Sequence, residues 1–136
     1  MEYKVCILAA GTGSRMGKFT KVFNKALIPL KGKPAICHII NKFSIDTSIV
    51  IAVGYKKDTI IEYLTYNYPE RDLKFISVDK WSGEGSGPGY SLLCCKDYLQ
   101  TPFIQFAADT LVAEDIPYPS RNYVGLSAVK NTKRFC

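Results

Sequence analysis

Acidic residues are missing from the first third of the chain. Between Glu2 and Asp46 there is no aspartate or glutamate. The basic residues of the same stretch are Lys4, Arg15, Lys18, Lys21, Lys25, Lys31, Lys33 and Lys42. A segment with charge of one sign attracts anions, so the sequence predicts an anion-binding region near the amino terminus. A basic nucleic-acid-binding domain is one alternative, although no known nucleic-acid-binding motif accompanies the charges.

The chain also lacks a CxxC pair and any apolar run of ~18 residues, the length needed to span a membrane. Its five cysteines are an odd set, and adjacent Cys94 and Cys95 point apart in either a helix or a strand. This pattern is typical of free, buried thiols in a reducing compartment. The chain opens directly into a strand pattern, without a charged and then apolar leader. We therefore expect a cytoplasmic chain, neither exported nor inserted in a membrane.

The length of 136 residues, 47% of them hydrophobic, predicts a single domain over residues 1–136. Apolar and β-branched runs predict strands at residues 3–10, 48–55, 73–79, 102–109 and 123–129. Apolar residues at helical spacing predict helices after Pro34, at residues 58–68 and at residues 90–99. Strands that alternate with helices through short connections predict an α/β fold with three layers and a mostly parallel sheet.

In such sheets, ligands bind where the strands end. This rule places three segments on one rim: residues 11–25 after the first strand, the glycine-rich loop at 81–89 and Asp109 at the end of the fourth strand. The rim is therefore the predicted functional site.

The glycines after the first strand have two possible uses. Gly11, Gly13 and Gly17 form GxGxxxG, whereas a dinucleotide-binding turn needs its third glycine at the position of Met16 and an acid ~20 residues later. Neither is present. The other use is a triphosphate cradle, in which backbone N–H groups approach the phosphates while Arg15 and the later lysines balance their charge.

Here the sequence resembles a known family. ILAAGTGSRM, followed by TKVFNKAL and IPLKGKP, resembles the signature of the sugar-phosphate nucleotidyltransferases and related cytidylyltransferases. Arg15 and Lys25 are ten residues apart, as in the sugar-phosphate branch. Lys18 and Asn24 depart from the pattern, because that branch commonly has prolines there, and prolines would stiffen the loop.

Two later stretches resemble the same family in the same order. GEGSGPGYSLL, residues 83–93, is similar to its second glycine-rich loop, which passes over the nucleotide base; Gly85, Ser86 and Gly87 match the positions that approach the base. FAADT, residues 106–110, is similar to the strand end whose aspartate, here Asp109, binds Mg²⁺. The implied fold is the Rossmann-like sheet of the nucleotidyltransferases.

The resemblance also implies roles and a reaction. Arg15 would bind the β- and γ-phosphates, and Lys25 the α-phosphate or the acceptor phosphate. The nucleotide-binding residues carried over near the first strand are Leu8, Ala9, Ala10, Gly11, Thr12, Gly13 and Ser14. The implied reaction joins a nucleoside triphosphate, CTP or UTP being favoured, to a sugar phosphate or alcohol phosphate and releases pyrophosphate.

The likeness implies only the nucleotide-binding half of such an enzyme, since family members are longer and their second half supplies the acceptor pocket. We therefore expect nucleotide binding with weak or no turnover. A non-catalytic nucleotide-binding module or an inactive fragment is the alternative. A sheet without its later strands would leave an open edge, so self-association is a further expectation.

Overall fold

A central parallel sheet organises the fold in the computed structural model, which describes residues 2–128 except for the side chains of Arg15, Met16, Phe19 and Thr20. The strands are β1 (Lys4–Ala9), β4 (Ile49–Val53), β5 (Leu73–Ser77) and β6 (Phe103–Ala107). They form one sheet in the order β5-β4-β1-β6, and every neighbouring pair is parallel. The first four of the five predicted strands and the mostly parallel sheet are confirmed.

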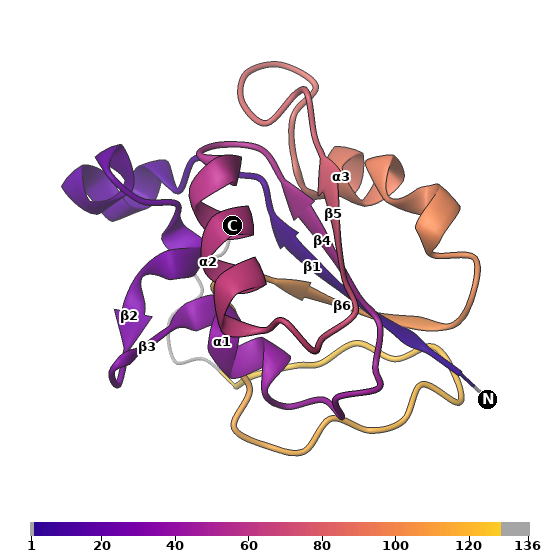
Figure 1. The fold of residues 1–136 in the computed structure, drawn as a ribbon. Helices are drawn as coiled ribbons and strands as arrows, with labels where there is room; N and C mark the ends of the chain where they lie inside the picture. The colour runs from indigo at the N-terminus through magenta and orange to yellow at the C-terminus, as the bar shows by residue number, and fades with distance from the viewer. Residues whose placement is uncertain (1, 129–136) are drawn as a thin grey trace.

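Helices cover both faces of this sheet (Figure 1). On one face lie α1 (Ala35–Ile40) and α2 (Lys57–Asn67), and their buried side chains, including Ile36, Ile40 and Ile60, pack against Ile7 and Ile51. On the opposite face lie α3 (Pro88–Cys94) and the 3₁₀ turn η3 (Lys96–Tyr98). There a smaller core joins the β1 and β4 side chains of that face to the segment around η3. The predicted three-layer arrangement is confirmed.

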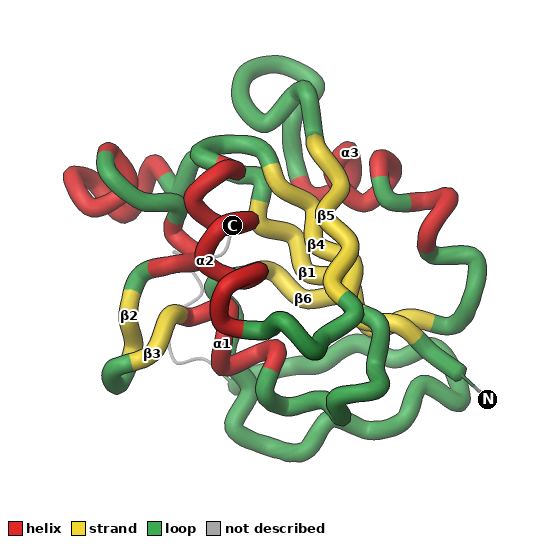
Figure 2. Tube along the Cα trace, in the orientation of Figure 1, coloured by secondary structure: helices red, strands yellow, loops and turns green. Residues whose placement is uncertain are grey.

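The basic segment after β1 contains more regular structure than the sequence predicts (Figure 2). It forms the 3₁₀ helices η1 (Ser14–Lys21), which is interrupted at Gly17, and η2 (Lys25–Leu27). A short antiparallel hairpin follows, made of β2 (Pro29–Leu30) and β3 (Lys33–Pro34). Lys31 and Gly32 have φ values of 49° and 77°, as the two central residues of a type I′ turn require.

The fifth predicted strand, residues 123–129, is wrong over residues 123–128, and residue 129 lies outside the described residues. No ladder forms there, and Val124 and Leu126 are 81% and 92% exposed. A β-strand is stabilised by the strand beside it, and within the described chain this segment pairs with none.

The described cysteines are free: Cys6, Cys37 and Cys95 are buried, and Cys94 is partly exposed. The prediction of free, buried thiols is confirmed for Cys6, Cys37 and Cys95; Cys94 is free but not buried, and Cys136 lies outside the described residues. A hydrogen bond to Cys95 and burial raise the pKa of Cys6. None of the helices over residues 2–128 is long and apolar enough to cross a membrane.

Candidate functional site

The order of the strands places a ligand-binding position beside β1. The chain runs from β1 to β4 and β5 on one side, and then returns to β6 on the other side. The loops that leave β1 and β6 therefore diverge at a topological switch point, where open α/β sheets bind their ligands. Gly11 lies in the loop after β1 and Asp109 in the loop after β6.

An ion pair connects the two sides of this switch point. The Nζ atom of Lys25 lies 3.2 Å from Oδ2 of Asp109, although the residues are 84 positions apart. The side chains are 22% and 54% exposed, and pairs in such contact with water contribute about 0–1 kcal/mol to stability. The fold gains little from this pair, but it brings two of the predicted site residues together where a ligand can reach both.

Asn24 fixes the position of Lys25. Its side chain is fully buried, and its Nδ2 donates hydrogen bonds to the carbonyl oxygens of Ala9 (3.0 Å) and Tyr55 (2.7 Å), at the ends of β1 and β4. Its Oδ1 accepts a hydrogen bond from the backbone N–H of Ala26 (2.9 Å) and so caps η2. One amide thus joins two strand ends to the helix that carries Lys25. Where the family pattern has proline, this chain holds the loop by hydrogen bonds.

The first glycine loop leaves its backbone accessible. A Cβ atom added at Gly11 would meet nothing within 4 Å, so an incoming group can approach the main chain there. Gly13 and Gly17 have φ values of 63° and 62°, a conformation that glycine adopts readily and other residues rarely. The side chain of Arg15 lies outside the described residues, so its predicted role stays a prediction.

The second glycine-rich loop starts at β5 on the same rim and leads into α3, which packs against β1. Gly83 and Gly85 both have φ values of 80°. The backbone N–H and the hydroxyl of Ser86 both donate to the Gly83 carbonyl, at 3.2 and 2.6 Å. Before this turn, Asp79 accepts a hydrogen bond from the Tyr90 hydroxyl, which lowers the pKa of Asp79 and raises that of Tyr90 to about 12.

Trp81 is the first residue of the loop predicted for the rim, but it was not singled out as a site residue. Its ring lies 5.3 Å from that of Tyr55, centroid to centroid, and covers Gly54 so closely that a Cβ there would lie 2.8 Å from the Trp81 Cβ. Asn24 was also missed, since the sequence showed it only as a departure from proline. The available signal was an asparagine directly before a short helical segment, which is an N-cap pattern.

The carboxylate of Asp109 suits one particular type of metal site. Over the described residues no three or more histidine, cysteine or acidic side chains gather in a group that could hold a metal. Mg²⁺, however, is commonly held by one or two carboxylates together with substrate phosphates and water. A half-exposed carboxylate at the switch point fits this arrangement, whereas a metal enclosed by protein ligands alone would not fit here.

Comparisons with known proteins agree with this geometry. A family model described as "MobA-like NTP transferase domain" matches residues 5–126. The bifunctional protein GlmU of Methanococcus vannielii is 34% identical over 132 residues, which cover 95% of this chain and 30% of that protein. A UTP–glucose-1-phosphate uridylyltransferase, AglF of Haloferax volcanii, is 27% identical over 77% of this chain and 42% of its own length.

A solved structure gives the same picture. The CTP:phosphocholine cytidylyltransferase of Streptococcus pneumoniae superposes with a TM-score of 0.70 and 28% identity, over 90% of this chain and 51% of that chain. The present chain thus spans about a third to a half of the proteins that it matches.

Proposed function

Because this chain belongs to the MobA-like NTP transferase domain family, we propose that it binds a nucleoside triphosphate at the switch-point rim and serves nucleotidyl transfer to a phosphorylated acceptor. The observation that carries the proposal is the 3.2 Å contact between Lys25 and Asp109. It joins a segment without acids to a carboxylate at the switch point, where open parallel sheets bind their ligands.

Each residue has a chemical role in this proposal. The backbone from residues 8 to 14 receives the phosphates, and Arg15 binds the β- and γ-phosphates through its planar guanidinium. Lys25 neutralises charge at the α-phosphate or the acceptor phosphate. Phosphoryl transfer needs mainly positioning and charge neutralisation, so a lysine held by a buried amide is well suited to it. Gly85, Ser86 and Gly87 would contact the nucleotide base.

Asp109 is the residue that we assign to Mg²⁺. An ion held by this carboxylate would supply further neutralisation of the developing charge. Without a ligand, Lys25 forms an ion pair with Asp109. When the ligands bind, this ion pair would break: Lys25 would bind the phosphates and Asp109 would bind the metal ion.

Binding isotherms with UTP and CTP test this assignment. We expect Lys25→Met to weaken binding about tenfold, the cost of one hydrogen bond to a charged group, while the matched control Lys96→Met, on exposed η3, leaves it unchanged. Asp109→Asn should weaken binding with Mg²⁺ but not without it, because the carboxylate repels a metal-free triphosphate. Equal effects of the Lys25 and Lys96 substitutions would refute the site.

A second experiment tests the acceptor and the turnover. The 136-residue chain is incubated with CTP or UTP, Mg²⁺ and a panel of hexose 1-phosphates and choline phosphate, and the release of pyrophosphate is measured. We expect the chain to bind the nucleotide but to release pyrophosphate slowly or not at all. The second candidate function is a nucleotide-binding module without turnover. Rapid pyrophosphate release would exclude that candidate.

A further inference from the structure

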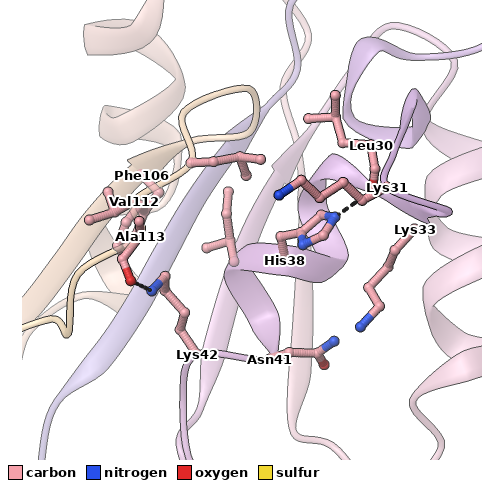
Figure 3. A pocket seen from close by; sticks show the side chains of 11 residues that line it. Leu30, Lys31, Lys33, His38, Asn41, Lys42, Phe106, Val112 and Ala113 are labelled. Atoms are coloured by element: carbon pink, nitrogen blue, oxygen red, sulfur yellow. Dashed lines mark hydrogen bonds between the residues drawn. The ribbon is translucent and has the colours of Figure 1, made fainter.

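A cavity of about 520 Å³ lies beside the β2–β3 hairpin (Figure 3). It is bounded by the β2–β3 hairpin, by α1 and by the segment that follows β6. Its volume falls within the usual range of small-molecule sites, about 300–1,000 Å³. Gly11, Lys25, Asp109 and the second glycine loop are not among the residues that line it. We call it the hairpin pocket.

The hairpin pocket is basic. Lys31, Lys33 and Lys42 line it, and none of the lining residues that the structure describes is acidic. Lys31 and Lys33 form no ion pair within residues 2–128. Lys42 donates hydrogen bonds to the carbonyl oxygens of Ala113 (3.3 Å) and Glu114 (2.9 Å), which are neutral partners. Among the described residues, no acidic group therefore compensates the charge of this pocket.

The backbone at Lys31 is a second observation. Its φ of 49° is a left-handed conformation that lysine rarely adopts, at a turn position where asparagine, aspartate or glycine is preferred. Strained positions of this kind often mark functional sites. In Figure 3 the Lys31 side chain extends from the hairpin over His38 toward the interior of the pocket. His38 in turn donates from Nε2 to the Leu30 carbonyl (2.7 Å), since a carbonyl only accepts.

The other walls are apolar. Leu30 and Leu111 are 43% and 41% exposed, and the other apolar lining residues are Ile39, Phe106, Val112 and Ala113. Cations next to exposed apolar surface fit a ligand that combines a charged group with an apolar or ring portion. A phosphate suits the two lysines without ion pairs best, because its oxygens can accept from several donors.

We propose that the hairpin pocket is a second anion-binding site, for a small molecule that carries a phosphate next to an apolar or ring portion, and that its occupancy is sensed at Asp109. The link is Lys42: a phosphate that attracts its ammonium competes with the carbonyls of Ala113 and Glu114, which follow Asp109 by four and five residues. This site goes beyond the proposed function and does not depend on it.

Amide NMR titration of the 136-residue chain with phenyl phosphate tests the proposal. We expect saturable shifts at residues 30–42 and 106–113, and at least tenfold weaker binding of inorganic phosphate and of benzyl alcohol, since each supplies only half of the contacts. The double substitution Lys31→Met/Lys33→Met should weaken phenyl phosphate about tenfold or more. Lys74→Met/Lys96→Met removes the same charge elsewhere and should change the affinity less than twofold.

Several results would overturn the proposal. Equal losses of phenyl phosphate affinity in both double variants would mean general attraction by a basic protein, and shifts confined to residues 11–25 would place the probe in the rim.

Folding of each variant is verified from its dispersed amide spectrum. At saturating phenyl phosphate, the amide signal of Asp109 should shift in the wild type but not in Lys42→Met. If it shifts equally in both proteins, Lys42 does not couple the pocket to Asp109. Binding of the probe should survive Lys25→Met, so failure of the proposed function leaves this test unaffected.

Discussion

Replacing Asn24 with alanine removes the one side chain that joins the ends of β1 and β4 to η2. Three hydrogen bonds disappear at once: two that the side-chain amide donates to the carbonyls of Ala9 and Tyr55, and one that it accepts from the N–H of Ala26. The residue is fully buried, so water does not readily replace them. Asn24→Ala is therefore the most informative single change at this site.

The expected cost follows from these contacts. Loss of a helix N-cap costs about 1 kcal/mol, and each carbonyl that loses its buried donor costs about 1 kcal/mol. The sum is about 3 kcal/mol of unfolding free energy. For a chain of this length, about 1 kcal/mol shifts Tm by about 3–4 °C, so Asn24→Ala should lower Tm by about 10 °C.

Calorimetry or thermal circular dichroism measures this change. The matched control is Asn67→Ala, because Asn67 also donates to a backbone carbonyl, that of Tyr63 at 2.8 Å, but on the exposed surface of α2; we expect less than about 0.5 kcal/mol there. Asn24→Asp keeps the cap oxygen but turns both donors into acceptors, so it should destabilise at least as much as alanine. Equal Tm values for Asn24→Ala and Asn67→Ala, or a mild Asn24→Asp, would contradict this account of the loop.

Two further perturbations test the packing around the rim. Gly54→Ala should displace Trp81, because the new Cβ would lie 2.8 Å from the Trp81 Cβ; Trp81 is the only tryptophan, so its fluorescence should shift to the red, whereas Gly89→Ala, with nothing within 4 Å, should leave it unchanged. Burial raises the pKa of Cys37 above 9.0, so the protonated thiol stabilises the fold fully below pH 9.0, and this stabilisation is lost as the pH rises above that value. The unfolding free energy should therefore fall less between about pH 8.5 and 10 in Cys37→Ala than in the wild type. An identical fall would show that this thiol does not contribute.

The sheet could be predicted because parallel strands buried on both faces give continuous apolar runs, as in β1, where five of six residues are buried. The topology then predicted the rim, and the contact of Lys25 with Asp109 agrees with it. The β2–β3 hairpin was missed because its strands have two residues each, too few for any alternation, and because Lys-Gly is not a usual hairpin turn.

Asn24 and the segment at 123–128 show two limits of local patterns. The role of Asn24 depends on which carbonyls the chain brings near it, and these lie 15 and 31 residues away. Residues 123–128 have the composition of a strand, but strand formation depends on a neighbouring edge. For Asn24 the partners are distant in sequence, and for residues 123–128 no neighbouring strand is found in the described chain. The residue types alone could predict neither outcome.

The contacts of its lysines show what the absence of acids does in the amino-terminal third of the folded chain. Lys4 and Lys42 bind backbone carbonyls, which satisfy their donors without cancelling their charge. Lys25 is paired, but with a carboxylate that comes from β6 and is half exposed. The segment therefore keeps its positive potential when folded, and a partly exposed ion pair is the cheapest contact to exchange for a phosphate and a metal.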